Sequence, residues 1–197
     1  MDEIQQLVDA IRRQSLEGVQ VALAAGADPN AYVENISMLG MLLGVVERFT
    51  EMDGERWLGI LRALLDAGAD PNQSIDGPSS EPFYFLHAVS QFAQLPAMRL
   101  LFQYGAHPNL LVEGTDTALD YASGDADFIQ TCKLPEEYVD QQLPEYPPPS
   151  DAEFDRQGLV FHLWLMSRHQ RGQVLLREAG ALHARELLGI TVDSQVL

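Results

Sequence analysis

Apolar residues recur at helical spacing in several separate stretches of the chain. Within residues 54–68, one face of a helix would carry Trp57, Leu58, Leu61, Leu64 and Leu65. Comparable apolar stripes predict further helices at about residues 7–14, 16–25, 37–49, 84–93, 96–104 and 117–124. Ser37 is a suitable N-cap for one of these helices, and Pro96 suits the first turn of another. The pattern therefore predicts an all-α protein.

Similar sequences follow four of the helical stretches. They are LAAGADPN at 23–30, LDAGADPN at 65–72, FQYGAHPN at 102–109 and the weaker LREAGALHA at 176–184. The glycine stands where a positive φ closes the last turn, and the proline prevents the helix from resuming. Asparagine then favours a turn. The sequence therefore predicts a repeated unit of helix, short link, helix, glycine stop and extended finger.

These endings, and the openings that follow them, resemble the ankyrin repeat. The ending is GADPN at 26–30 and 68–72 and GAHPN at 105–109, while TALDYA at 117–122 and FLHAV at 85–89 match the opening in part. The resemblance covers roughly residues 1–125. It implies an ankyrin-repeat solenoid of about five helix pairs with a degenerate C-terminal capping repeat, and a concave face that binds proteins. It also implies that His87 makes structural hydrogen bonds between repeats.

The spacing of the units departs from the family period of about 33 residues. Successive glycine stops lie 42, 37 and 75 residues apart, and the last interval has room for about two units. Five prolines and several acids in 134–151 indicate an extended acidic insertion. We therefore expect ankyrin repeats in 1–133, an acidic proline-rich insertion in 134–150, and a degenerate helix pair in 151–197 that caps the same solenoid.

The charge of the chain is strongly negative and unevenly distributed. The net charge is −17, and residues 113–155 contain 12 acids against the single Lys133. Such a surface repels nucleic acid and would speed the encounter with a basic protein. A net charge of this size would also arise from selection for solubility alone, so both interpretations stay open.

Metal and calcium sites have only partial signatures. His162 and His169 are seven residues apart and could share a helical face, but no carboxylate or cysteine accompanies them. We expect one packing histidine and one surface histidine. Asp125 and Asp127 have the spacing that opens a calcium loop, but the later ligands are missing. No metal or cofactor is expected.

Catalytic motifs are also lacking. The sequence contains no glycine-rich phosphate loop, GxSxG, HExxH or CxxC, so no catalytic residues and no enzyme activity are expected. Cys132 lies beside Lys133 alone and is expected to be a bystander thiol, since activation needs an electropositive setting. A single cysteine and the lack of a leader-like N-terminus favour a cytoplasmic location. The apolar runs are too short to span a membrane.

Candidate partner-binding residues lie in the fingers and in the insertion. The fingers are expected at about 30–36, 72–82 and 109–116. The candidates in and beside them are Tyr32, Glu34, Asp76, Glu81, Tyr84, Glu113 and Asp116. The insertion adds Glu136, Glu137, Tyr138 and Asp140, as contact residues or as parts of a solvated linker.

These features favour a binding module for a basic protein partner, monomeric alone and heterodimeric with that partner. By analogy with small stand-alone bacterial proteins of this type, the sharper hypothesis is an immunity or inhibitor protein that blocks a cationic enzyme such as a toxin nuclease. The alternatives are an adaptor or scaffold, an effector that acts on host proteins, and an enzyme whose site the sequence does not reveal.

Overall fold

The computed structural model describes residues 2–45, 54–78, 80–123 and 168–189. Several sequence-based expectations fall outside these ranges and stay predictions. They concern the 134–150 insertion and its boundaries, Asp125, Asp127, Cys132, Glu136, Glu137, Tyr138, Asp140 and His162.

The described residues are mainly helical, as the apolar pattern predicts. The helices are α1 (Glu3–Arg12), α2 (Leu16–Ala24), α3 (Met38–Gly44), α4 (Glu55–Asp66), α5 (Phe85–Gln91), α6 (Leu95–Gln103), α7 (Ala118–Ser123), an unlabelled helix over 168–178, and α11 (Ala184–Leu187). A small antiparallel hairpin of β1 (Tyr32–Val33) and β2 (Ile36–Ser37) is the one strand pair among them. None of these helices is both long and apolar enough to span a membrane.

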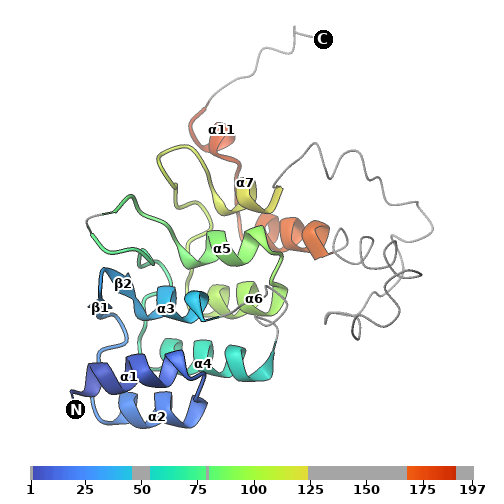
Figure 1. The fold of residues 1–197 in the computed structure, drawn as a ribbon. Helices are drawn as coiled ribbons and strands as arrows, with labels where there is room; N and C mark the ends of the chain where they lie inside the picture. The colour runs from blue at the N-terminus through green and yellow to red at the C-terminus, as the bar shows by residue number, and fades with distance from the viewer. Residues whose placement is uncertain (1, 46–53, 79, 124–167, 190–197) are drawn as a thin grey trace, which may run out of the picture.

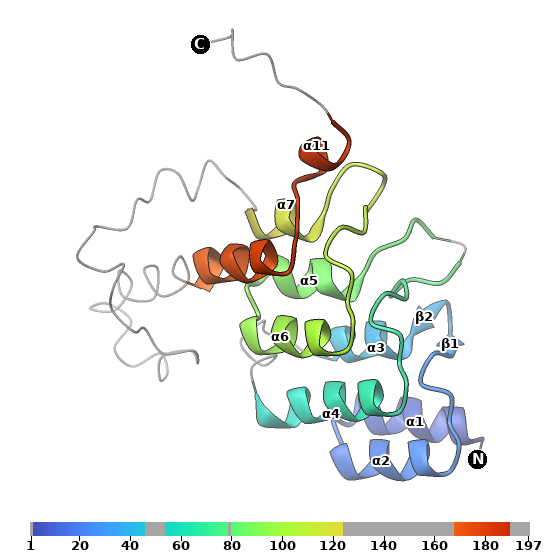
Figure 2. The same cartoon turned by 180° about the vertical axis from the view of Figure 1, so that it is seen from behind.

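The helices form two columns. In one column α1, α3, α5, α7 and α11 follow one another upward (Figure 1), and in the other α2, α4 and α6 are followed by the helix over 168–178 (Figure 2). The loops that join one helix pair to the next all project at the same end of the helices. The helix pairs are therefore stacked in sequence order, with one set of loops along one edge.

The helix ends follow the sequence signals. Gly26, Gly68, Gly105 and Gly180 have φ of 102°, 94°, 85° and 85°, so all four predicted glycine stops are confirmed. The Ser37 hydroxyl accepts a hydrogen bond from the Gly40 N–H at 3.1 Å and caps α3, as expected.

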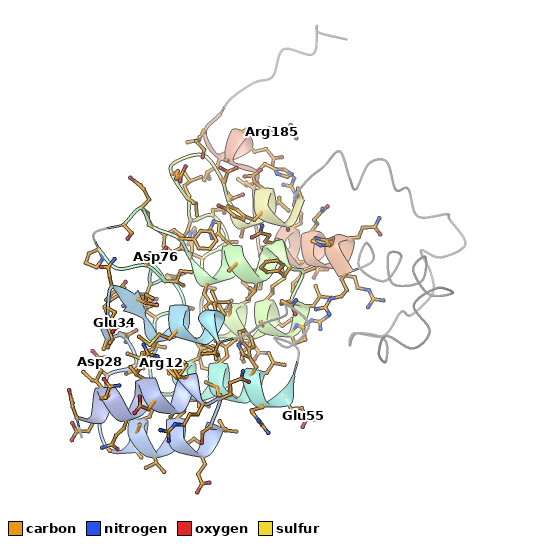
Figure 3. The ribbon with its side chains drawn as sticks, viewed as in Figure 1. Arg12, Asp28, Glu34, Glu55, Asp76 and Arg185 are labelled. Atoms are coloured by element: carbon orange, nitrogen blue, oxygen red, sulfur yellow. The ribbon has the colours of Figure 1, made fainter. Side chains whose placement is uncertain are left out.

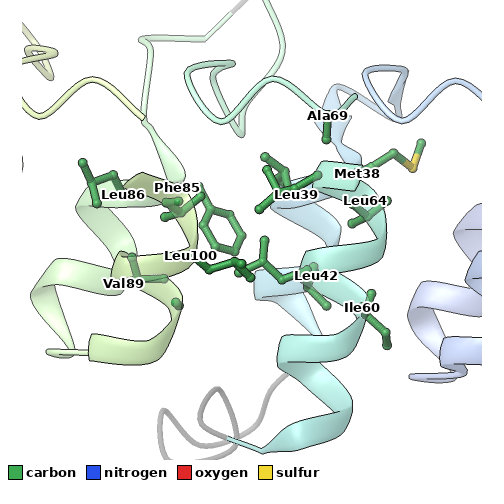
Figure 4. Close-up of a cluster of buried hydrophobic side chains, with 14 of the residues drawn as sticks. Met38, Leu39, Leu42, Ile60, Leu64, Ala69, Phe85, Leu86, Val89 and Leu100 are labelled. Carbon is green, nitrogen blue, oxygen red and sulfur yellow. The ribbon is translucent and has the colours of Figure 1, made fainter. Parts of the chain in front are cut away.

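Large apolar side chains from successive helix pairs meet in one core (Figure 4). The buried residues labelled there are Met38, Leu39, Leu42, Ile60, Leu64, Ala69, Phe85, Leu86, Val89 and Leu100. The Trp57 ring stacks on Phe85 with ring centroids 5.9 Å apart, and its indole N–H donates to the Leu42 carbonyl at 3.0 Å. Burying an aromatic side chain of this size contributes on the order of 3 kcal/mol, and here it joins the second helix pair to the third.

The asparagine of each of the first three helix endings joins neighbouring units. Asn30 donates from Nδ2 to the Gly68 carbonyl at 2.9 Å, and its Oδ1 accepts from the Asp70 N–H at 2.7 Å. The carbonyl of a closing glycine has no helical partner, so this contact satisfies one of the exposed groups at a helix end. The sequence alone suggests only a turn-forming role for this asparagine.

The same two hydrogen bonds occur at two further junctions. Asn72 donates from Nδ2 to the Gly105 carbonyl at 3.0 Å, and its Oδ1 accepts from the His107 N–H at 2.6 Å. Asn109 donates from Nδ2 to the Gly180 carbonyl at 3.0 Å, and its Oδ1 accepts from the Leu182 N–H at 2.7 Å. The weak fourth ending at 176–184 therefore occupies the structural position of the other endings.

The long interval between Gly105 and Gly180 holds one helix pair within the described residues. Gln173 donates to the Ala122 carbonyl at 3.4 Å, and His169 Nδ1 lies 3.4 Å from the same oxygen, so the helix over 168–178 packs against α7. We expected about two units here. Within the described residues, Asn109 connects both glycine stops and the helix over 168–178 pairs with α7. Residues 124–167 lie outside the described residues, so the number of units in the whole interval stays a prediction.

Arg168 joins the first described turn of this helix to the residues that follow α5. Its side chain is only 2% exposed, and Nε and Nη2 donate to the Ala93 carbonyl at 3.0 and 2.8 Å. Nη2 also reaches Gln94 Oε1 at 3.2 Å. Because Ala93 follows the C-terminus of α5, the guanidinium cation lies at the negative end of a helix dipole.

Candidate partner-binding face

Three segments project from the same end of the helices. We call residues 30–37 finger 1, residues 72–84 finger 2 and residues 109–117 finger 3 (Figure 1). Each follows a glycine stop and leads to the next helix of the first column, so the spacing of the helix pairs sets the spacing of the fingers.

Fingers 1 and 2 are hydrogen-bonded to each other. The Tyr32 hydroxyl donates to the Ser74 carbonyl at 3.0 Å, and the Ser37 N–H donates to the Ile75 carbonyl at 2.9 Å. Gly40 permits this approach, because a Cβ at that position would lie 2.6 Å from the Ile75 carbonyl oxygen. The two fingers therefore form one fixed surface rather than independent loops.

The end of finger 2 folds back on its own start. The Ile75 N–H donates to the Phe83 carbonyl at 2.7 Å, and Ser74 and Tyr84 form a bridge. Tyr84 is consequently the N-cap residue of α5, with its side chain half-buried.

The acidic candidates in the described part of the chain lie along this face. Glu34, Glu81, Glu113 and Asp116 are exposed, and Asp76 is half-buried. Figure 3 shows Glu34 and Asp76 at the finger end of the molecule, whereas Glu55 lies at the opposite end. The sequence of the three fingers contains no lysine or arginine.

One base approaches the fingers from α1. The Arg12 guanidinium lies 3.3 Å from the Glu34 carboxylate, with side-chain exposures of 51% and 74%. A pair this exposed contributes less than about 1 kcal/mol, and it neutralises Glu34, the one acid in the sequence of finger 1. The acids of fingers 2 and 3 carry most of the remaining negative charge.

An aromatic cluster lies between fingers 2 and 3. The His87 ring is centred 5.3 Å from Tyr121, 5.5 Å from Tyr84 and 6.2 Å from Phe83. Phe83 and Tyr121 are themselves 5.5 Å apart. We call Phe83, Tyr84, His87 and Tyr121 the aromatic cluster. The two tyrosines and Phe83 are half-buried, while His87 is fully buried.

His87 has the structural role implied by the resemblance. Its Nε2 lies 3.0 Å from the Leu110 carbonyl of finger 3, so it joins neighbouring units. Burial lowers its pKa, although the carbonyls of Leu110 and Asp116 and the carboxylates of Asp116 and Asp120 act in the opposite direction. The ring is therefore neutral at neutral pH. With Nε2 donating to Leu110, the buried Nδ1 is an acceptor without a hydrogen-bond partner among the described residues.

Burial and nearby acids raise the pKa of two tyrosines on this face. Burial raises the pKa of Tyr121, and the charges of Asp116 and Glu113 raise it further. Burial also raises the pKa of Tyr32, as do the charges of Asp70 and Asp76, against a hydrogen bond from Gln73 that lowers it. The acids in and beside fingers 2 and 3 therefore favour the protonated form of these two tyrosines.

Asp120 holds the base of finger 3 to the start of α11. Its carboxylate accepts from Thr117 N at 2.9 Å, Thr117 Oγ1 at 2.8 Å, Ala184 N at 2.8 Å and His183 Nδ1 at 2.7 Å. Burial opposes ionisation of Asp120, but the donors of Thr117, Ala184 and His183 outweigh it and lower its pKa. This carboxylate is a structural group rather than a part of the exposed face.

The sequence pattern singles out the acids of this face but only half of its aromatic residues. Tyr32 and Tyr84 were expected, whereas Phe83 and Tyr121 were not singled out. Tyr121 was visible within the TALDYA motif, one helical turn after Thr117, on the side of α7 that faces α5. The candidate residues of the insertion lie outside the described residues, so their part in binding stays a prediction.

The described residues contain no group of three or more His, Cys, Asp or Glu side chains that could hold a metal ion. Two pockets lie away from the fingers. One, of about 340 Å³, lies between α2 and α4, and the other, of about 440 Å³, is lined by Leu119, Val174 and His183 among others.

No protein-family model matches the chain, and a search of the curated proteins finds none similar to it.

Proposed function

We propose that this chain is an ankyrin-repeat solenoid that binds a basic protein partner through the exposed side of its fingers. The fold part of the proposal is supported by three identical asparagine junctions and four glycine stops with positive φ. It is further supported by the bond from His87 to finger 3, which matches the role that the family gives to this histidine.

The observation that carries the binding proposal is the composition of the fingers. They expose acids from three successive units beside half-buried tyrosines, and their sequence contains no lysine or arginine. Each finger is fixed by hydrogen bonds to its neighbour or to the helix behind it. A fixed set of like charges steers an oppositely charged partner and loses little entropy when it binds.

The sharper form of the proposal is an immunity or inhibitor protein. A basic enzyme that acts on nucleic acid has a positively charged groove, and an acidic surface of rigid fingers can cover such a groove. The protein would then act in the cytoplasm as a monomer that forms a heterodimer, without catalysis, metal or cofactor. Binding of this kind depends on long-range charge, so it weakens as salt concentration rises.

A capture experiment with two matched variants tests this function. The finger variant Glu81→Lys/Glu113→Lys and the control variant Glu17→Lys/Glu55→Lys change the net charge by the same amount, and all four residues are exposed. Glu17 and Glu55 lie in the first turns of α2 and α4, which belong to the second column. Each protein is immobilised and exposed to native cell extract at low and high salt, and the retained proteins are identified by mass spectrometry.

The expected result is one basic protein retained by the wild type and the control variant, lost from the finger variant, and released by high salt. Equal loss from both variants would reduce the effect to net charge alone and contradict a binding face at the fingers. Retention of many partners without a basic bias would favour the adaptor alternative.

A further inference from the structure

The aromatic cluster and the acids of finger 3 come from three different parts of the chain. Phe83 and Tyr84 precede α5, Tyr121 is in α7, and Glu113 and Asp116 are in finger 3. Tyr121 is half-buried, so its side chain is partly open to solvent, and Glu113 and Asp116 are exposed. A partly open ring in the field of two exposed carboxylates suits a ligand of positive charge.

We propose that the Tyr121 ring, with Glu113 and Asp116 near it, receives one arginine side chain of the basic partner. This inference rests on the proposed function and names the group that the finger face recognises. Aromatic faces attract cations, and the attraction is stronger where water is partly excluded. Carboxylates beside the rings would pair with the same cation.

The surroundings of the cluster favour a cation in three ways. The charges of Asp116 and Glu113 already act on the Tyr121 hydroxyl and raise its pKa. His87, which packs edge-on against Tyr121, is neutral because burial lowers its pKa, so it does not repel a cation. Its buried Nδ1 has no hydrogen-bond partner among the described residues, so its lone pair adds to the negative potential around the cluster.

The geometry favours arginine over lysine. Guanidinium is planar and weakly hydrated, stacks on aromatic faces and pairs with carboxylates through several N–H donors, whereas ammonium is a strongly hydrated point charge. The Tyr121 ring is held by rings at steep angles to it, 85° for His87 and 55° for Phe83. A ring fixed in this way offers a stationary surface for stacking.

The test uses three heptapeptides in which glycine alternates with arginine, lysine or citrulline, the neutral analogue of arginine. Binding to the isotopically labelled full chain is measured by NMR titration at low salt. The variants are Tyr121→Leu, which removes the ring, and Tyr121→Phe, which keeps it. The matched control is Tyr104→Leu, because Tyr104 is also a half-buried tyrosine near an acid, in this case Asp66, to which it donates a hydrogen bond, but it lies at the C-terminal end of α6 in the second column. Thermal unfolding confirms that each variant is folded.

The arginine peptide is expected to bind, the lysine peptide to bind several-fold more weakly, and the citrulline peptide not to bind. Tyr121→Leu should weaken arginine binding by about threefold to tenfold, as expected for loss of one cation–π contact, while Tyr121→Phe and Tyr104→Leu stay near wild type. Equal binding of arginine and lysine peptides, no loss in Tyr121→Leu, or no binding of any peptide would overturn the inference. If the finger variant Glu81→Lys/Glu113→Lys still loses the captured partner in that case, the proposed function stands and only the arginine site falls.

Discussion

The bases and the tips of the fingers are built from the same three segments but have opposite chemistry. At the bases, Asn30, Asn72 and Asn109 each use both ends of the amide group in hydrogen bonds to the next unit. At the tips, side chains such as Glu81 and Glu113 are charged and exposed. Base residues satisfy the backbone of a neighbour, whereas tip residues face water or a partner.

The difference separates residues that specify the fold from residues that are available for binding. A hydrogen bond at the base of a finger satisfies a backbone group that would otherwise lack a partner, so losing the bond lowers the free energy of unfolding. A charge at the tip has little effect on stability, because solvent and salt screen it. Changes at the bases should therefore alter stability, and changes at the tips should alter binding while leaving stability near wild type.

The largest expected effect is at Asp120, at the base of finger 3. Asp120→Ala leaves two backbone N–H groups, Thr117 and Ala184, and the His183 ring without their acceptor. We expect a loss of about 2–4 kcal/mol in the free energy of unfolding, measured by urea denaturation. The tip variant Glu113→Ala should stay within about 0.5 kcal/mol of wild type. Equal losses in the two variants would erase the distinction between base and tip.

A smaller loss is expected at the junction formed by Asn72. Asn72→Ala removes the bonds to the Gly105 carbonyl and the His107 N–H, and should cost about 1–3 kcal/mol in urea denaturation. Glu81→Gln, at the tip of the same finger, is the matched control and should be nearly neutral. A neutral Asn72→Ala would mean that water replaces the asparagine without cost.

The third largest expected effect is a loss of folding stability on acidification. The lowered pKa values of His87 and His169 mean that the folded state holds both rings neutral, while the unfolded chain takes up protons from about pH 6.5 downward. Stability should therefore fall as pH drops from about 6.5, by at most about 1.4 kcal/mol per pH unit for each ring. The lowered pKa of Asp120 gives the same sign in a lower window, since its stabilisation is present above about pH 4 and lost as pH falls through its folded pKa.

Denaturation of His87→Gln at pH 7.5, 6 and 5 checks this assignment. Glutamine can still donate to the Leu110 carbonyl but does not titrate. The variant should lose less stability than the wild type between pH 6.5 and 5. A pH dependence identical to that of the wild type would remove His87 from the explanation.

The smallest effect is expected at the pair of Arg12 and Glu34. Both side chains are largely exposed, so Glu34→Gln should change the free energy of unfolding by less than about 0.5 kcal/mol. In a double-mutant cycle with Arg12→Gln, the coupling should be equally small. A coupling above about 1 kcal/mol would make this tip contact part of the base framework.

Much of the fold could be predicted from the sequence because its signals are local. Glycine stops at Gly26, Gly68 and Gly105, the N-cap at Ser37 and the apolar faces of the helices each depend on a few neighbouring residues. The junction role of Asn72 depends on groups 33 and 35 residues away, so no local pattern reveals it. The registration of the helix over 168–178 against α7 likewise follows from contacts across a long stretch of sequence.

The candidate site was predictable only in part. Acids such as Glu34, Asp76 and Glu113 are recognisable in the finger sequences, because each stands four residues after the asparagine of a helix ending. The aromatic cluster was not, since Phe83 and His87 meet Tyr121 only when α5 and α7 pack side by side. Asp120 was not among the candidates, and its carboxylate is a half-buried hydrogen-bond acceptor at the base of finger 3 rather than an exposed acid.

The most direct measurement is site-specific photo-cross-linking in cells that produce the protein. A photoreactive phenylalanine analogue replaces Tyr32 on finger 1 or Val21 on α2, which are 37% and 59% exposed. We expect a cross-linked basic protein from position 32 and none from position 21. Cross-links from position 21 alone, or the same products from both positions, would contradict a binding face at the finger tips.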